Sequence, residues 1–296
     1  MTDPNAMPAS TPLCATDAYT DCTIKVAAVP LDIRWADIDT NLRRCGEILA
    51  GIDPDTDVVV LPELFTTAFI SDPDVLPEAA EELDGRTMKW VYDKARRLDL
   101  AIAGSLLTVR DGTYYNTAFF MKPDGEVWYS DKRHLFSLSP ELKLFGQGKT
   151  TLPVIEFRGW NISIIVCYDM RFPVWCRNDG QKYDLMLVAA NWPTAREYAW
   201  NSLIVARAIE NQAAWVGADR SGADDYGNYD GLARICDPWG MVVAQADKGH
   251  PEEVLYATFS KLELSKIRKK LPVGRDADSF RLITSQPLEE PHARHF

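Results

Sequence analysis

The stretch IIVCYDMRFP, residues 164–173, places a cysteine at the end of an apolar run. The β-branched residues before Cys167 predict a buried strand, and polar and proline residues follow the cysteine at once. A lone cysteine after such a run is more often inert core, because free cysteine is among the most buried residue types. The alternative is a nucleophile at the carboxyl end of a strand, where ligand chemistry gathers in α/β folds.

Two other apolar strands predicted from the sequence also end in a charged side chain. VVVLPELF, residues 58–65, leads to Glu63, and VWYSDKRHLF, residues 127–136, leads to Lys132. A charge beside a buried run has a desolvation cost, so it usually has a partner or a function. Taken singly, a glutamate such as Glu63 is more often a solvated strand end, and a lysine such as Lys132 is more often a surface residue. Together with Cys167 they favour a shared site that holds a thiol, a carboxylate and an ammonium group.

This set of groups suits acyl transfer by a cysteine. The thiol of Cys167 would attack a carbonyl carbon, and Glu63 would take its proton as general base. Lys132 and the backbone N–H of Tyr168 would stabilise the negative oxygen of the tetrahedral intermediate. Glu63 would then return the proton to leaving ammonia and activate water for deacylation.

The rest of the chain alternates short apolar β-branched runs with segments of helical spacing, which predicts an α/β fold. A hairpin is expected around Asp124-Gly125. No linker interrupts residues 23–280, so we expect a loose leading segment at 1–22 and one domain at 23–296. Strands are predicted at 24–33, 57–63 and 184–190, and helices at 35–52, 77–100 with a break near Gly85, 195–212 and 261–271.

Composition and charge limit the kinds of partner that we expect this chain to bind. The 296 residues include 32 Lys and Arg against 43 Asp and Glu, a net charge of −11. Such a chain repels phosphate backbones and anionic lipid, so we expect neither nucleic acid nor membrane as a partner. The first residues lack the pattern of a secretory signal, and the six cysteines are scattered. A cytoplasmic protein with reduced thiols is therefore expected.

Other motifs fit their context poorly. GQGKTT, residues 146–151, ends like a phosphate-binding loop, but Lys143 stands where the first glycine belongs and a strand follows. A Cys–His protease would need a helping histidine. His134 lies near Lys132 in the sequence and could orient it, although a solvated loop is the more ordinary interpretation. No His or Cys pair has metal-ligand spacing, so neither a metal nor an organic cofactor is expected.

The sequence resembles the carbon–nitrogen hydrolase (nitrilase) superfamily over about residues 24–280. The resemblance implies a single-domain four-layer α-β-β-α sandwich, a Glu–Lys–Cys triad at Glu63, Lys132 and Cys167, and a homodimer or higher homo-oligomer. A second glutamate of the superfamily matches Glu141, which would assist by positioning the substrate or Lys132. The motifs that carry the resemblance are LPELF, DKRHLF, CYDMRFP, ANWP (190–193), ARAIENQ (206–212) and DPWG (237–240).

Within the superfamily, the Cys-Tyr-Asp sequence is similar to amidases, whereas nitrilases carry Cys-Trp-Glu. CYDMRFPVW, ANWP and DAD (276–278) are most similar to omega-amidases, which hydrolyse the terminal amide of 2-oxoglutaramate and related 2-oxo acid monoamides. Such a substrate carries a carboxylate, and Arg171 is its candidate partner. A structural ion pair of Arg171 with Asp169 or Glu210 is an equal alternative.

Other residues are expected around the pocket. Asn191 and Trp192 follow a buried strand and would line it, although Trp192 would suit the core equally. Arg207 is expected to form a structural ion pair. The segments 66–80 and 221–231 would set the pocket size.

The expected reaction is hydrolysis of a small amide to acid and ammonia through a thioester at Cys167. Three alternatives remain open. The protein could be another amidase or a nitrilase of the superfamily, it could transfer the acyl group to an amine, or it could be a binding protein that keeps the fold without activity.

Overall fold

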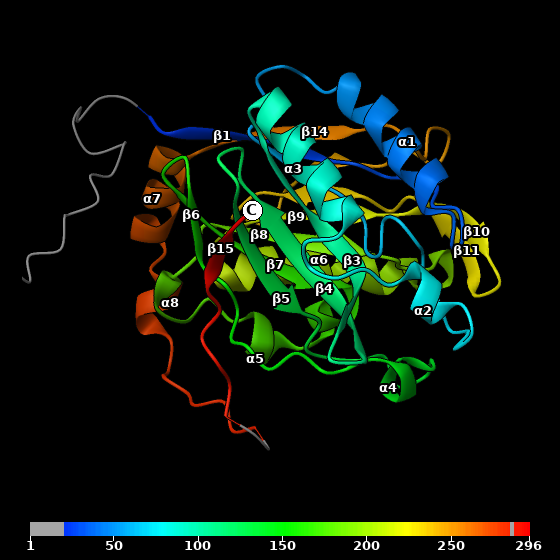
Figure 1. Ribbon diagram of the computed structural model, residues 1–296. Coiled ribbons are helices and arrows are strands. Elements are labelled where there is room, and N and C mark those ends of the chain that lie inside the picture. Colours follow the sequence, from blue (N-terminus) through cyan, green and yellow to red (C-terminus); the bar gives the residue numbers. More distant parts are fainter. Residues whose placement is uncertain (1–20, 285–286) are drawn as a thin grey trace, which may run out of the picture.

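The computed structural model describes residues 21–284 and 287–296. Two large β-sheets pack against each other, and helices cover their outer faces (Figure 1). The expected four-layer α-β-β-α architecture is therefore confirmed. The predicted leading segment 1–22 lies almost entirely outside the described residues, so its boundary with the domain stays a prediction.

The first sheet has seven strands in the order β14-β1-β2-β3-β4-β5-β15. Its central strands β1, β2 and β3 run parallel, and the other neighbours pair antiparallel. The hairpin predicted at Asp124-Gly125 joins β4 to β5. The bounds are β1 (Thr23–Ala28), β2 (Val58–Val60), β3 (Ala101–Arg110), β4 (Thr113–Met121), β5 (Glu126–Asp131), β14 (Leu255–Ser260) and β15 (Ala293–His295).

The second sheet has six strands in the order β13-β12-β9-β8-β7-β6. Strands β7, β8 and β9 run parallel at its centre. A separate hairpin, β10 (Ser221–Asp224) with β11 (Gly227–Asp230), lies within the predicted loop 221–231. The sheet bounds are β6 (Ile155–Phe157), β7 (Trp160–Val166), β8 (Leu185–Ala190), β9 (Ala214–Asp219), β12 (Arg234–Cys236) and β13 (Val242–Gln245).

Alternation along the strands builds the layers. In β2, Val58 and Val60 pack in the core between the two sheets, while Val59 packs on the opposite face. Because side chains alternate along a strand, one all-valine strand serves both faces of a buried sheet. That opposite face is covered by α1 (Ile38–Ala50) and α3 (Arg86–Leu98). The outer face of the second sheet packs on α6 (Glu197–Asn211).

The helices follow from the spacing of their apolar residues and from their caps. The buried residues Ile38, Cys45 and Leu49 recur on one face of α1, and the side chain of Asp37 caps its first turn by accepting from Thr40 N. The helix predicted at 77–100 is confirmed only in part: α3 begins at Arg86, as the break near Gly85 predicts, but the helix before the break ends at Ala79 and residues 80–85 are not helical.

The remaining helical elements are short, apart from α7. Within the described residues, no helix is long and apolar enough to cross a membrane. The elements are α2 (Leu76–Ala79), α4 (Glu141–Leu144), α5 (Pro173–Cys176), α7 (Lys261–Lys270), α8 (Val273–Asp276) and the 3₁₀ turns η1 (Cys167–Arg171), η2 (Asp179–Gln181) and η3 (Thr194–Arg196).

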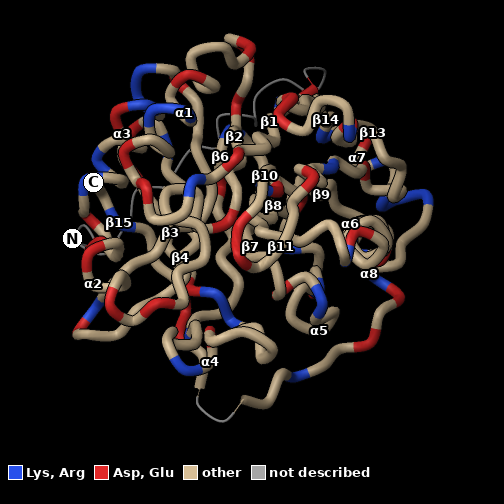
Figure 2. The backbone as a smooth tube through the Cα atoms, turned by 90° about the vertical axis from the view of Figure 1, so that its right-hand side faces the viewer, with Lys and Arg blue, Asp and Glu red and all other residues tan. Residues whose placement is uncertain are grey.

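Charged residues of both signs are interspersed over the outer helices and loops (Figure 2). No continuous positive stripe is visible along the backbone in this view. The distribution agrees with the acidic net charge of −11.

Candidate active site

Four strand ends converge on one cavity. Cys167 follows β7 directly, Asn191 follows β8, and Lys132 follows β5. Glu63 comes three residues after β2, and its N–H donates to the carbonyl of Ala190 at 3.3 Å, which joins the ends of the two sheets. These four side chains line a cavity of about 300 Å³. The structure thus brings together the residues that the separate motifs predicted.

Cys167 lies on a sharp turn directly after β7. Its φ is +43°, in the left-handed region that residues other than glycine rarely adopt, and η1 begins at this residue. Its side chain lines the cavity, and the residue is 9% exposed, whereas Cys45, Cys176 and Cys236 are 0% exposed. Cys167 therefore differs from the core cysteines in having access to a cavity.

The side chains of Glu63, Lys132 and Glu141 form a buried charged chain. Lys132 Nζ donates to Glu63 Oε1 at 2.9 Å and to Glu141 Oε1 at 2.7 Å, and all three side chains are at most 5% exposed. Asn116 Nδ2 donates to Glu63 Oε1 at 2.7 Å, and the backbone N–H of Asn191 donates to Glu63 Oε2 at 2.9 Å. Both oxygens of Glu63 are thus held in place.

The surroundings set the protonation of these groups. Burial and the neighbouring carboxylate of Glu63 raise the pKa of the Cys167 thiol well above its usual range. Burial alone would lower the pKa of Lys132, but Glu63 and Glu141 outweigh it and raise that pKa. Burial also raises the pKa of Glu141. At neutral pH the site therefore holds a protonated thiol beside an ammonium group.

Asp169 ties the cysteine turn to the lysine segment. Its Oδ1 accepts from the backbone N–H of His134 at 2.8 Å and lies 2.7 Å from His134 Nδ1. Its Oδ2 accepts from the N–H groups of Arg133 and Val166, each at 3.4 Å. The His134 ring stacks on Phe172, with 3.7 Å between centroids. His134 therefore holds Asp169 instead of lying in a solvated loop.

Arg171 has neither of the ion pairs considered as alternatives. Asp169 is engaged by His134, and Glu210 pairs with Arg207 at 3.0 Å, which confirms the structural pair expected for Arg207. Among residues 21–284 and 287–296, no acidic group lies within 4.0 Å of the Arg171 guanidinium. The guanidinium carbon lies 4.5 Å from the centroid of the Trp192 ring, and Arg171 lines the cavity.

Trp192 meets both expectations, because it lines the cavity and is also buried, at 2% exposure. Its N–H donates to Asp219 Oδ1 at 2.6 Å, and its Nε1 donates to the carbonyl of Arg196 at 2.9 Å. Asn191 and the residue Tyr168, whose N–H was predicted to bind the oxyanion, also line the cavity.

Sequence reasoning missed several residues of this site. Asn116 was detectable as a polar residue inside the apolar strand TYYNTAFF, and Asp219 as a carboxylate at the end of the apolar run AAWVGAD, whereas Arg196 gave no such signal. The segments 66–80 and 221–231 do contribute to the wall, as expected. The aromatic residues of the cavity that sequence reasoning did not name are Phe69, Phe136, Tyr226 and Tyr229.

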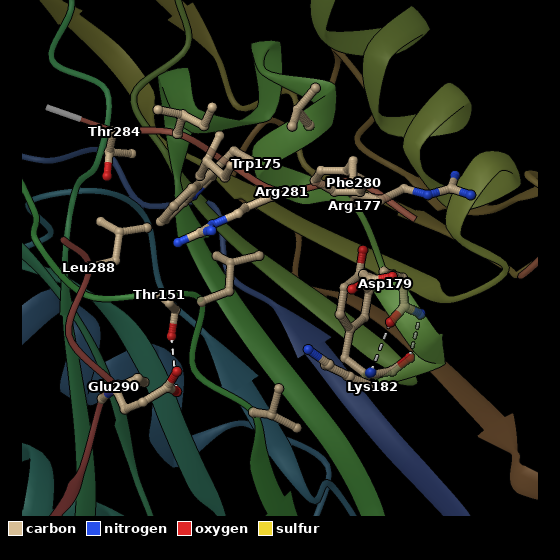
Figure 3. A pocket seen from close by; sticks show the side chains of 18 of the residues that line it. Thr151, Trp175, Arg177, Asp179, Lys182, Phe280, Arg281, Thr284, Leu288 and Glu290 are labelled. Carbon is tan, nitrogen blue, oxygen red and sulfur yellow. Dashed lines mark hydrogen bonds between the residues drawn. The ribbon is translucent and has the colours of Figure 1, made fainter. Parts of the chain in front are cut away.

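A larger cavity of about 920 Å³ lies under the C-terminal segment (Figure 3). Trp175, Phe280 and Leu288 contribute to its lining, and Thr151 Oγ1 donates to Glu290 at 3.2 Å beside it. None of the predicted site residues borders it. Across the part of the chain that the structure describes, no group of three or more His, Cys, Asp or Glu could hold a metal ion. The smaller cavity is thus the candidate active site.

An α-β-β-α sandwich with a thiol, two carboxylates and an ammonium group at its strand ends narrows the class of protein. The family model for carbon–nitrogen hydrolases matches residues 25–269. The chain belongs to this family, so it is a carbon–nitrogen hydrolase.

Individual proteins agree with this assignment. The chain is 41% identical over 265 residues to the omega-amidase YafV of Yersinia enterocolitica, covering 88% of this chain and 99% of that one. It is 31% identical over 255 residues to the 2-oxoglutaramate amidase of Bacillus subtilis (strain 168), covering 85% and 96%. The crystal structure of XC1258 from Xanthomonas campestris, a superfamily protein with an arsenic adduct in its active site, matches with a TM-score of 0.82 and 35% identity, covering 88% and 99%.

Proposed function

We propose that the protein is an omega-amidase that hydrolyses the terminal amide of a small 2-oxo acid monoamide, of the 2-oxoglutaramate type, to acid and ammonia. The observation that carries the proposal is the convergence of Glu63, Lys132 and Cys167 on one small cavity that also contains Arg171. The names of the relatives, omega-amidase and 2-oxoglutaramate amidase, support the substrate class.

The first half of the proposed reaction forms a thioester. The sulfur of Cys167 attacks the amide carbon while Glu63 accepts the thiol proton, because the thiol is protonated at neutral pH. Lys132 and the N–H of Tyr168 stabilise the oxyanion. Glu63 passes the proton to the nitrogen, the C–N bond breaks and ammonia leaves.

The second half reverses these roles with water. Glu63 accepts a proton from water as its oxygen attacks the thioester carbon, and the same two donors stabilise the second oxyanion. The C–S bond then breaks, the acid is released and the proton returns to Cys167. The cycle needs neither a metal nor an organic cofactor.

Glu141 is proposed as an assisting residue. One of its oxygens binds Lys132, and the other accepts from the backbone N–H of Phe136. With Glu63 on its other side, Lys132 is held between two carboxylates, which fixes the direction of its ammonium group toward the cavity. Glu141 would thus position Lys132 for the oxyanion.

Arg171 is proposed to bind the carboxylate of the substrate. Its guanidinium lies on Trp192 without an acidic partner, so it is available to a planar anion at the cavity wall. Asn191 and Trp192 would line the substrate, with the backbone N–H of Asn191 holding Glu63. An amide without a carboxylate would leave Arg171 unsatisfied.

Ammonia release from 2-oxoglutaramate tests this proposal, with glutamine, asparagine, an aliphatic amide and a nitrile beside it. We expect the fastest release from the 2-oxo amide, lost in Cys167→Ala. Faster turnover of another amide or of the nitrile would change the assigned substrate class but leave the assignment of the triad unchanged. No ammonia release from any of these compounds, with product formed only when an amine acceptor is added, would favour acyl transfer. No activity in either assay would favour a binding protein.

The proposal includes a homodimer or higher homo-oligomer in a reducing compartment such as the cytoplasm. Exposed apolar side chains on α6 and beside β13 support self-association, namely Tyr198, Ile209, Trp239 and Met241. Light scattering would measure the mass, and a monomer at micromolar concentration would contradict this part.

A further inference from the structure

Arg196 is a second arginine on the wall of the same cavity. It ends η3, immediately before α6, and is exposed at the rim, whereas Arg171 is half-buried. Its guanidinium carbon lies 5.1 Å from the centroid of the Phe136 ring. Its carbonyl accepts from Trp192 Nε1, and Arg171 lies over that same indole. One tryptophan therefore connects the two arginines.

No acidic group lies within 4.0 Å of the Arg196 guanidinium among the described residues. The adjacent Glu197 pairs instead with Lys248 at 2.7 Å. Some exposed arginines elsewhere have a carboxylate partner, as Arg43 has Glu47 at 2.8 Å, whereas exposed Arg96 has none within 4.0 Å in the described part of the chain. What distinguishes Arg196 is that it is without an acidic partner among these residues and also lines the cavity, in a chain with an excess of acidic residues.

The charges around the cavity favour an anion. Three cationic side chains, Lys132, Arg171 and Arg196, face two carboxylates, Glu63 and Glu141, while the thiol is protonated. The cavity therefore has a surplus of one positive charge in a chain of net charge −11. Both glutamates bind Lys132, so the surplus resides on the arginines. One carboxylate on the substrate would balance it.

We propose that Arg196 is a specificity-determining residue that captures the carboxylate of the substrate at the rim, together with Arg171. This inference rests on the proposed function and adds a residue to it. Guanidinium groups bind carboxylates through paired hydrogen bonds and attract them over longer distances. Because Arg196 is at the rim, its contribution lies in substrate binding, and an amide without a carboxylate gains nothing from it.

The test compares Arg196→Gln with the parent protein on 2-oxoglutaramate and on pentanamide, an uncharged amide of similar length. We expect kcat/KM for the 2-oxo amide to fall roughly tenfold, mainly through KM, as for the loss of a charged hydrogen bond. The value for pentanamide should change less than twofold. Arg196→Lys should restore part of the loss. Added salt should lower kcat/KM for the 2-oxo amide more in the parent than in Arg196→Gln, because salt screens the attraction between the arginine and the carboxylate. Arg43→Gln is the matched control.

A second readout separates this inference from the proposed function. Iodoacetamide should alkylate Cys167, which lines the cavity, and 2-oxoglutarate, the acid product, should protect it in the parent and protect about tenfold less well in Arg196→Gln. Suppose that the parent hydrolyses the 2-oxo amide, that Arg196→Gln lowers kcat/KM equally for both amides or for neither, and that protection by 2-oxoglutarate is unchanged. The inference about Arg196 then fails, while the proposed function stands. If the parent is inactive on amides, the function fails and the protection assay alone decides the role of Arg196.

Discussion

Lys132 Nζ lies 2.9 Å from Glu63 Oε1, although the two residues are 69 positions apart and both side chains are at most 5% exposed. Breaking a buried ion pair leaves one charge without compensation. The pair therefore matters for stability as well as for the proposed chemistry, and the two effects can be measured apart.

Lys132→Met should destabilise the protein by about 3–5 kcal/mol, because two buried carboxylates lose their shared cation. Urea unfolding measures the change, and turnover should be lost as well. Lys89→Met, an exposed lysine on α3, is the control and should change stability by less than about 0.5 kcal/mol. Equal effects of the two substitutions would contradict a buried role for Lys132.

The stability that Lys132 contributes should depend on pH. Its pKa is raised in the folded state above the usual 10.5, so its contribution is fully present below 10.5 and is lost as pH rises through the folded pKa. The difference in unfolding free energy between the parent and Lys132→Met should therefore be constant from pH 7 to 9 and shrink in stronger alkali. A difference in unfolding free energy that grows above pH 10.5 would contradict a raised pKa of Lys132 in the folded state.

Glu63→Gln should lower the pKa of Cys167 while abolishing turnover. The charge of Glu63 is one cause of the raised thiol pKa, after burial, and the amide removes it. The alkylation rate of Cys167 by iodoacetamide, followed by peptide mass, should reach its midpoint at a lower pH than in the parent. Lys132→Met should shift the midpoint the other way, since the ammonium lowers that pKa. An unchanged midpoint in both variants would show that neither charge acts on the thiol.

Asn116→Ala should reduce kcat/KM by about 10- to 100-fold, because Glu63 loses a hydrogen bond worth about 1.5–3 kcal/mol to a charged group. Steady-state kinetics on the best substrate provide the measurement. Asn228→Ala, at an exposed position in β11, is the matched control. Full activity in Asn116→Ala would mean that Glu63 is held without it.

Asp169→Asn should lower kcat by about 100-fold, the effect expected when reacting groups shift by about 1 Å. The asparagine keeps one acceptor oxygen, which cannot accept hydrogen bonds from both His134 and the N–H of Val166. KM should change little, because Asp169 does not line the cavity. A variant that raises KM with kcat unchanged would contradict a role in positioning the cysteine turn.

The motifs at Glu63, Lys132 and Cys167 could be found from the sequence because each ends a local apolar run, and strand ends gather ligand chemistry. The break near Gly85 and the hairpin at Asp124-Gly125 were also predictable, since turn chemistry is local. Periodicity alone predicts an α/β fold but does not specify four layers, which the resemblance to the family implied.

Long-range partners could not be predicted in this way. Asn116 reaches Glu63 across 53 positions, and the partners of Asp169 come from a segment 35 positions away. β15 at the C-terminus pairs with β5, which no local pattern specifies (Figure 1). Whether Arg171 is paired depends on the partners of Asp169 and Glu210, so its availability emerges only from the packed structure.

In the proposed reaction, Cys167 forms a thioester with the acyl part of an amide. Rapid acid quenching of the protein during turnover of 2-oxoglutaramate, followed by peptide mass analysis, would trap this intermediate. We expect an added acyl mass on the peptide that contains Cys167, removed by hydroxylamine and absent in Cys167→Ala. Steady ammonia release with no adduct on that peptide, and persisting in Cys167→Ala, would contradict this intermediate.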